Sequence, residues 1–145
     1  MNDVTKINLE EIKALVTNVF LKQGCNKVNA EALARTITKA EEDGASSHGL
    51  FRVPGYVASL KSGKVNGKAS PKVKNVTPVI LQCDADNGFA STAHEKALPM
   101  LAEAAKTNGI SVLSIKGCYH FAALWPETEY LAQQNLVGVA CTAFK

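Results

Sequence analysis

The segment ISVLSIK at residues 110–116 decides the fold class, because an apolar run rich in β-branched residues predicts a buried strand. The segment VILQCD at residues 79–84 predicts an earlier strand of the same kind. Residues 91–107 lie between the two and have helical character, with Pro99 expected to interrupt or bend the helix. A strand, a helix and a second strand in succession are typical of an α/β layer.

The same alternation continues beyond this strand. LWPETEYLAQQ at residues 124–134 predicts a helix, and LVGVACTAF at residues 136–144 predicts another strand. An apolar strand of this kind normally lies inside a sheet and is followed by further structure. We therefore expect the chain to be a fragment, or a half whose remainder lies in another polypeptide. The alternative is an edge strand at a genuine C-terminus.

Residues 1–63 are expected to be helical. Asn8 can cap a first helix whose third position is Glu11, and Gly24 is a natural end for this helix. Helical spacing predicts an apolar face made of Leu9, Ile12, Leu15, Val16, Val19 and Phe20.

Two more helices are expected in this region. One starts near Asn29 and carries the oppositely charged Glu31 and Arg35 four positions apart, a spacing that places them side by side on a helix. The other covers residues 54–60, where a proline suits the first helical turn and favours extended backbone at the preceding Val53.

Composition limits the classes of function. The hydrophobic fraction of 46% and the charged fraction of 20% are those of a soluble globular protein. The net charge of +3 comes with scattered lysines, which indicate no nucleic-acid partner but are compatible with small anionic ligands. Because the sequence has no signal-type apolar block and no apolar run of about 18 residues, we expect a cytoplasmic protein without a membrane partner.

Several residue types that often bind metals or form disulfides are interpreted here as structural. The acidic stretch DADN at residues 84–87 is interpreted as a turn rather than a metal site, and His94 as a surface residue. No CxxC spacing occurs, so a disulfide framework or a zinc site is not expected. We predict buried free thiols at Cys25, Cys83, Cys118 and Cys141.

The first candidate for chemistry is EDGASSHGLFRVPGY at residues 42–56. The His48 imidazole can transfer a proton near neutral pH, Ser47 can hydrogen-bond it, and Arg52 offers a planar fork for a carboxylate. On a helix, His48, Arg52 and Tyr56 would share one face. The alternative is a capping serine and a surface histidine in a glycine-flanked loop.

The second candidate is IKGCYHFAALWPETE at residues 115–129, where a strand passes a glycine and enters a helix. Backbone N–H groups at such a junction can receive phosphates. His120 is followed by the small Ala122 and Ala123, which would let a bulky cofactor come close. The alternative is a structural histidine and a packed Trp125. No G-x-G-x-x-G occurs, so an ordinary Rossmann fingerprint is absent.

Taken together, the motifs resemble the malate/L-lactate dehydrogenase family of NAD(P)-dependent oxidoreductases. Many members have a glycine after the His-Phe pair, whereas this chain has HFAALWP at residues 120–126, a version similar to the Δ1-piperideine-2-carboxylate/Δ1-pyrroline-2-carboxylate reductases. The resemblance rests on four stretches in the same order: DGASSHGLFRVPGY (43–56), LKSGKVNGKASPKV (60–73), CDADNGFA (83–90) and GISVLSIKGCYHFAALWPETEYLAQQNLVGVACTA (109–143).

The resemblance implies roles for individual residues. His48 would be the proton donor, Ser47 its relay partner and Arg52 the group that binds the substrate carboxylate. Thr142 matches a threonine near the active site in many relatives. We expect both Thr142 and Tyr56 to contact the substrate. The cofactor would be lined by His120, Phe121, Ala122, Ala123 and Leu124.

The resemblance also implies an architecture. We expect a helical N-terminal region over residues 1–74. A polar, extended crossing segment at residues 64–78 would connect this region to the next one. Residues 75–145 would form the first part of a non-Rossmann NAD(P)-binding α/β domain with a largely antiparallel or mixed sheet. Family chains are considerably longer and form homodimers. The missing half carries more cofactor contacts and an aspartate that completes the relay, so this chain would act as a homodimer or pair with a chain carrying that half.

The implied activity is reduction of a cyclic imino acid, Δ1-piperideine-2-carboxylate or Δ1-pyrroline-2-carboxylate, to L-pipecolate or L-proline by hydride from NADPH, with NADH as the alternative cofactor. Hydride transfer to C=N leaves negative charge on nitrogen, which a positioned acid must neutralise. Two alternatives stay open: a 2-keto acid reductase of the malate/L-lactate type, and an inactive fragment that retains only dimerisation or binding.

Overall fold

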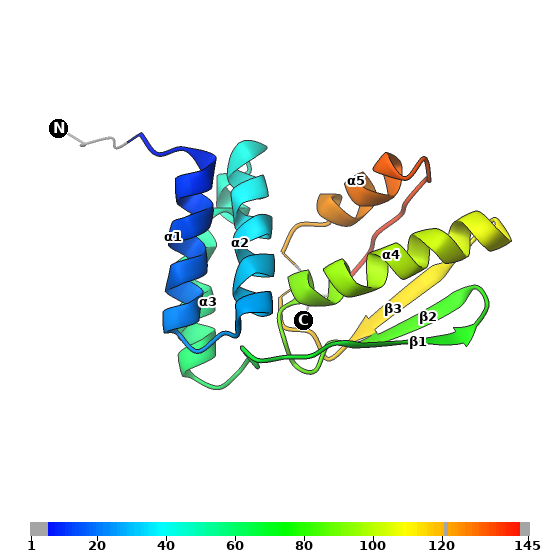
Figure 1. Ribbon diagram of the computed structural model, residues 1–145, viewed down its shortest axis with the longest axis horizontal. Coiled ribbons are helices and arrows are strands. Elements are labelled where there is room, and N and C mark those ends of the chain that lie inside the picture. The colour runs from blue at the N-terminus through cyan, green and yellow to red at the C-terminus, as the bar shows by residue number, and fades with distance from the viewer. Residues whose placement is uncertain (1–5, 121, 143–145) are drawn as a thin grey trace.

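The computed structural model describes residues 6–120 and 122–142, in which a group of helices precedes a small helix-and-sheet layer (Figure 1). The α-helices are α1 (Leu9–Lys22), α2 (Lys27–Glu42), α3 (Val53–Lys61), α4 (Ala90–Asn108) and α5 (Trp125–Gln133). The strands are β1 (Lys72–Thr77), β2 (Ile80–Asp84) and β3 (Val112–Lys116). Two short 3-10 turns, η1 (Ser46–His48) and η2 (Leu50–Arg52), join α2 to α3.

The first helix begins as the sequence predicts. Asn8 accepts a hydrogen bond from the Glu11 backbone N–H, and the Glu11 carboxylate accepts one from the Asn8 N–H, each at 2.9 Å. The helix ends before Gly24, whose φ of 93° suits a residue without a Cβ. The expected apolar face is only partly buried, because Leu9 and Leu15 are exposed beside the buried set Ile12, Val16 and Phe20.

Helix α2 starts two residues earlier than predicted. Asn26 is its N-cap and accepts a hydrogen bond from the Asn29 backbone N–H, while Asn29 itself is fully buried inside the helix. Glu31 and Arg35 lie on the same helix and their charges interact, as expected, but the close ion pair of Arg35 is not with Glu31. Arg35 forms a bidentate ion pair with Glu95 of α4, with both N–O distances at 2.7 Å. The fold places the Glu95 carboxylate opposite the guanidinium, and the two planar groups match in geometry.

Helix α3 confirms the prediction of a helix around residues 54–60, with a proline in its first turn. Extended backbone at Val53 was predicted, and this is wrong: Val53 has φ −54° and ψ −48° and is already helical. The reason is that η2 leads directly into α3, so the chain is coiled before the proline is reached.

The sheet is mixed, as expected, with the order β1-β2-β3. Strands β1 and β2 are antiparallel neighbours, β2 and β3 are parallel, and α4 lies between the sheet and α5 (Figure 1). The polar sequence KVKNVT, expected to belong to an extended crossing segment, forms strand β1, because its backbone pairs with β2. The proposed boundary after residue 74 falls within this strand.

Three predictions about the later elements differ from the structure. The strand predicted at residues 110–116 forms as β3 but is not buried, because no described strand or helix covers Ile110 and Val112, which are exposed. Helix α4 is continuous from Ala90 to Asn108 and includes Pro99, so the helix is not interrupted there. The described part of the expected last strand, residues 136–142, forms no strand, and Val137 and Val139 are 98% and 91% exposed. A strand requires a hydrogen-bonded partner, and this segment has none in the described sheet. Residues 143 and 144 lie outside the described residues.

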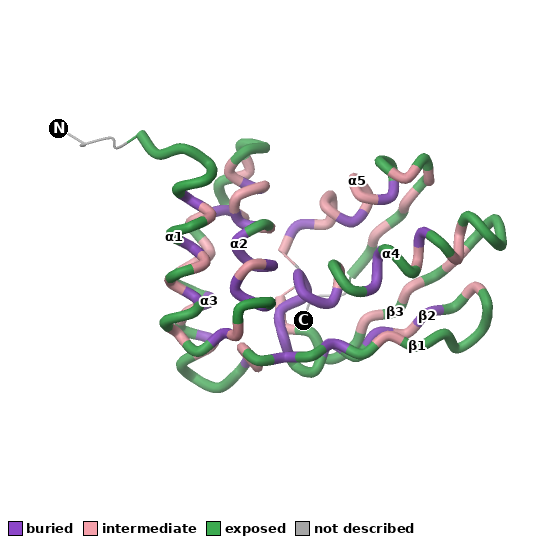
Figure 2. Tube along the Cα trace, viewed as in Figure 1, coloured by how far each residue is buried: buried purple, intermediate pink, exposed green. Residues whose placement is uncertain are grey.

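The buried residues form a larger cluster among the N-terminal helices and a smaller one between α4 and the sheet (Figure 2). Phe89, at the N-cap of α4, belongs to the larger cluster and so ties the two parts together. All four cysteines are free; Cys25 and Cys83 are buried as predicted, whereas Cys118 and Cys141 are exposed. Within residues 6–120 and 122–142, none of the helices combines the length and apolar character that crossing a membrane needs.

Candidate active site

The 3-10 turns after α2 hold three of the predicted site residues together. The Ser47 hydroxyl lies 3.0 Å from His48 Nδ1, and Arg52 Nε donates to the Ser47 backbone carbonyl at 2.7 Å. Glu41, near the end of α2, accepts a hydrogen bond from the Leu50 N–H at 2.6 Å. A Cβ at Gly49 would collide with the Glu41 carboxyl group. The glycine in the Ser-His-Gly motif therefore leaves room for the Glu41 carboxylate beside the turn that carries the histidine.

The second motif meets the first at Tyr56. The Tyr56 hydroxyl lies 2.9 Å from His120 Nδ1, and the two rings make an edge contact with centroids 5.2 Å apart. The Ala122 backbone N–H also donates to His120 Nδ1, at 3.1 Å. Since Nδ1 accepts from an N–H, it carries a lone pair, and the imidazole is neutral with its proton on Nε2. The Tyr56 hydroxyl therefore donates to the same nitrogen.

Electrostatics support a neutral His120. Its pKa is lowered from the usual 6.5, first because the ring is desolvated by burial and then because Arg52 and His48 place positive charge near it. Burial raises the pKa of Tyr56 to about 12, an effect that Arg52 partly opposes. The tyrosine is thus protonated at neutral pH and can donate a hydrogen bond, and the Arg52 guanidinium lies near both the Tyr56 and His120 side chains.

Trp125 makes a second connection between the motifs. Its ring meets His48 edge-on at 5.7 Å between centroids, and its indole N–H donates to the Asp43 carboxylate at 2.9 Å. The carboxylate in turn has a lowered pKa, chiefly because of Lys39 and then because of Trp125. Trp125 is therefore a packed residue, as the alternative interpretation of the second motif expected. The ring that it packs against is His48, the candidate histidine of the first motif.

The stretch expected to line a cofactor has unusual backbone geometry. His120 and Ala122 have φ values of 50° and 58°, in the left-handed region that disfavours residues with a Cβ. Ala123 is buried and Leu124 half-buried. Small side chains on a strained turn after β3 provide the close approach that a nicotinamide cofactor needs, so the residues present fit such a group. Phe121 lies outside the described residues.

Thr142 is not joined to this cluster by any contact among the described residues. It is exposed and lies in the segment after α5 that forms no strand. Ser47, His48, Arg52, Tyr56 and His120 are thus brought together, and Thr142 is not.

His94 was predicted to be a surface residue, and this is wrong. Its side chain is 18% exposed, and Nδ1 lies 3.0 Å from Oε1 of Glu127, whose side chain is 10% exposed. Both residues line a cavity of about 390 Å³ between α2, α4 and α5, next to Ala122 and Ala123. The helical phase of α4 was the available signal, since His94 lies four residues before the buried Leu98 and so shares its face.

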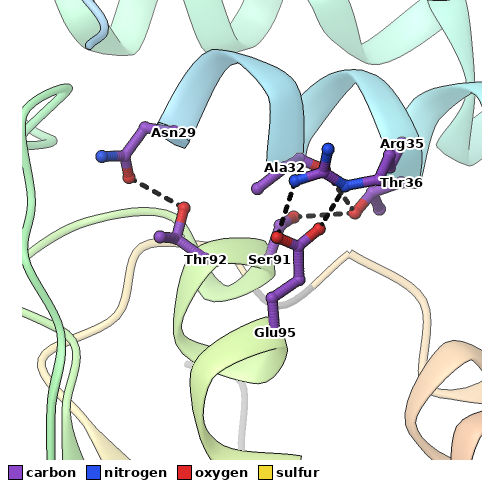
Figure 3. Close-up of polar contacts among 7 residues, drawn as sticks. All are labelled: Asn29, Ala32, Arg35, Thr36, Ser91, Thr92 and Glu95. Atoms are coloured by element: carbon purple, nitrogen blue, oxygen red, sulfur yellow. Dashed lines mark hydrogen bonds and ion pairs between the residues drawn. The ribbon is translucent and has the colours of Figure 1, made fainter. Parts of the chain in front are cut away.

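Polar contacts hold α2 against α4 beside this cavity. Figure 3 shows Arg35 and Thr36 of α2 facing Glu95 and Ser91 of α4, with Thr36 Oγ1 and Ser91 Oγ 3.0 Å apart. Nearly two turns earlier in α2, the buried Asn29 side chain accepts a hydrogen bond from the Thr92 hydroxyl at 2.8 Å.

Comparison with known proteins identifies the family. The family model described as malate/L-lactate dehydrogenase matches residues 7–145, so the chain belongs to the malate/L-lactate dehydrogenase family. The chain is 41% identical to a Δ1-pyrroline-2-carboxylate reductase of Ancylobacter novellus, over 99% of this chain and 44% of the relative. It is also 41% identical to a Δ1-pyrroline-2-carboxylate/Δ1-piperideine-2-carboxylate reductase of Pseudomonas putida, over 94% and 40%.

Solved structures agree with the family. The Δ1-piperideine-2-carboxylate reductase of Pseudomonas syringae matches with a TM-score of 0.87 and 40% identity, over 90% of this chain and 40% of that one. Sulfolactate dehydrogenase of Methanocaldococcus jannaschii matches with a TM-score of 0.78 and 28% identity, over 85% and 36%. The chain thus spans less than half the length of the curated relatives and solved structures it resembles.

Proposed function

We propose that this chain is the N-terminal part of an NAD(P)H-dependent oxidoreductase that reduces a cyclic imino acid, Δ1-pyrroline-2-carboxylate or Δ1-piperideine-2-carboxylate. The observation that carries the proposal is the meeting of the two motifs, in which Tyr56 hydrogen-bonds His120 and His120 lies within electrostatic reach of His48 and Arg52. Relatives about 40% identical are named as reductases of these two substrates, which favours an imino acid over a keto acid.

In this proposal Arg52 orients the substrate, and His48 and Ser47 transfer the proton. Arg52, oriented by its Nε bond to the Ser47 carbonyl, would bind the substrate carboxylate through its remaining N–H groups. His48 would give a proton to the substrate nitrogen as negative charge develops there, and Ser47, hydrogen-bonded to Nδ1, would relay that proton. The cofactor, NADPH in this proposal, supplies the hydride when bound.

The remaining assignments belong to the same proposal. His120, Phe121, Ala122, Ala123 and Leu124 would line the cofactor, and Tyr56 and Thr142 would contact the substrate. We propose that residues 1–74 and 75–145 are the helical region and the first part of the cofactor domain. We also propose that the protein is cytoplasmic and acts as a homodimer or together with a chain that supplies the rest of the relatives' length.

The test is to follow NADPH absorbance with Δ1-pyrroline-2-carboxylate, using this chain alone and together with a polypeptide corresponding to the rest of a relative. His48→Ala should lower kcat severely and leave cofactor binding nearly unchanged, and Arg52→Lys should mainly raise KM because a fork becomes a point charge. The matched control is Ser46→Ala, an exposed serine in the same turn, which should change neither parameter.

Two results would contradict the proposal. Rapid turnover of pyruvate or oxaloacetate without turnover of the cyclic imine would identify a keto-acid reductase. No turnover of either class in both preparations would identify an inactive fragment.

A further inference from the structure

The His48 side chain is attached to a short turn. The turn η1 has no side-chain cap, and the Ser47 hydroxyl that meets His48 Nδ1 belongs to an exposed residue. An imidazole on such a turn can change rotamer unless another element packs against it. Helix α5 provides this contact at its first residue. The Trp125 ring lies 5.7 Å from the His48 ring between centroids, with the two ring planes 81° apart.

The Trp125 indole is itself held at its N–H group. Nε1 donates to Oδ2 of Asp43, the C-cap residue of α2, at 2.9 Å. The acceptor is charged at neutral pH, because the pKa of Asp43 is lowered, chiefly by Lys39 and then by the indole. A hydrogen bond to a charged acceptor is stronger than one between neutral groups. This bond therefore fixes the orientation of the indole ring.

Lys39 joins the same carboxylate to α5. Its Nζ lies 3.1 Å from Oδ1 of Asp43 and 3.4 Å from Oε1 of Glu129, one turn beyond Trp125. Lys39 thus engages one oxygen of Asp43 and the indole engages the other. The contacts form a continuous series from Lys39 through Asp43 and Trp125 to His48.

We propose that Asp43 and Trp125 are positioning residues for His48. Asp43 holds the indole, and the indole limits rotation of the imidazole, so that Nδ1 stays directed at the Ser47 hydroxyl. The inference deepens the proposed function and rests on it, because His48 is the proton donor of that proposal. A general acid is effective when its proton is held at the reacting atom, so a rotating imidazole loses part of its contribution.

A carboxylate near a histidine can also act on it directly through its charge. The two explanations differ once the indole N–H is absent. If Asp43 acts through Trp125, then Asp43→Ala has no further effect on His48 in a chain that already carries Trp125→Phe, whereas a direct effect of charge persists there. Asp43→Asn distinguishes them in a second way, because it keeps an oxygen acceptor for the indole and removes the charge.

The test is an NMR comparison of imidazole chemical shifts and ¹³C relaxation in the whole chain, a measurement that requires no turnover. The chain has three histidines, and His48→Ala assigns the His48 signals. The variants are Asp43→Ala, Asp43→Asn, Trp125→Phe and the combination of Asp43→Ala with Trp125→Phe. The matched control is Glu42→Ala, which removes the neighbouring exposed carboxylate, also paired with Lys39. Circular dichroism verifies that each variant is folded.

We expect Asp43→Ala to shift the His48 signals and to increase the motion of its ring on the ps–ns timescale. Asp43→Asn should stay close to wild type, and Glu42→Ala should change neither quantity. Trp125→Phe should increase the ring motion, and adding Asp43→Ala to it should change nothing further. With a polypeptide that supplies the rest of a relative, Asp43→Ala should lower kcat roughly tenfold and leave KM nearly unchanged, because Arg52 is not displaced.

The outcomes separate this inference from the proposed function. Equal effects of Asp43→Ala on His48 with and without Trp125→Phe, or no effect in either chain, overturn the positioning role. If Asp43→Ala is unfolded, Trp125→Phe decides, and unchanged motion of the His48 ring in that variant overturns the inference. If no cyclic imine is turned over, the proposed function fails, while the NMR comparison still decides whether Asp43 and Trp125 position His48.

Discussion

A fully buried amide is one of the contacts that join the helical region to the α/β layer. Asn29 donates from Nδ2 to the Ala69 carbonyl at 2.9 Å and to Asn26 Oδ1 at 2.8 Å, and its Oδ1 accepts from the Thr92 hydroxyl at 2.8 Å. The residue is fully buried, so Asn29→Ala would remove three hydrogen bonds and leave two distant partners without their donor or acceptor. At about 1 kcal/mol for each bond, unfolding should become easier by roughly 3 kcal/mol.

A loss of that size should lower Tm by roughly 9 °C in a domain of this length. The measurement is urea and thermal denaturation, followed by circular dichroism and by the fluorescence of Trp125, the single tryptophan of the chain. The control is Asn18→Ala, an exposed asparagine in α1, which should change stability by less than about 0.5 kcal/mol. A loss below about 1 kcal/mol for Asn29→Ala would refute the reasoning that this amide joins the two parts.

Four further predictions concern the histidine cluster and the turn beside it. Tyr56→Phe removes a donor to neutral His120, so it should cost about 1 kcal/mol of stability and raise the pKa of His120 in an NMR titration; an unchanged pKa would show that the hydroxyl does not reach Nδ1. Arg52→Gln should also raise that pKa toward 6.5, since it removes nearby positive charge. Because the folded pKa lies below the unfolded value, the unfolded chain binds more protons in this range. The contribution of His120 to stability should be complete above pH 6.5 and fall as the pH drops through the folded pKa. Ala122→Gly should keep or raise Tm, because φ is 58° there, whereas the control Ala123→Gly should cost about 1 kcal/mol; a large loss for the first would contradict the left-handed geometry.

The family's frequent glycine after His-Phe has a physical explanation in this geometry. The corresponding residue here is Ala122, and its left-handed backbone is one that glycine adopts without penalty. The sequence resemblance locates this position, but the conformation that makes a glycine favourable there is seen only in the folded chain.

Local signals predicted local structure well. The capping box of Asn8 and Glu11 and the helix end at Gly24 depend on residues within one or two turns, so their hydrogen bonds are readable from spacing. Predictions that depended on a distant partner failed more often. The close ion pair of Arg35 is with Glu95 of another helix. Asn29 does not cap its helix but hydrogen-bonds Thr92 at the buried junction between α2 and α4.

The sequence by itself determined the family, the helix-then-sheet order and the identity of the two motifs at residues 42–56 and 115–129. Only the tertiary structure decided that these motifs meet, through a hydrogen bond between residues 64 positions apart. It also decided that His94 turns away from solvent toward Glu127. The physical reason is that caps and turns are closed by neighbours in the chain, whereas burial and the partner of a polar group depend on which elements pack together in space.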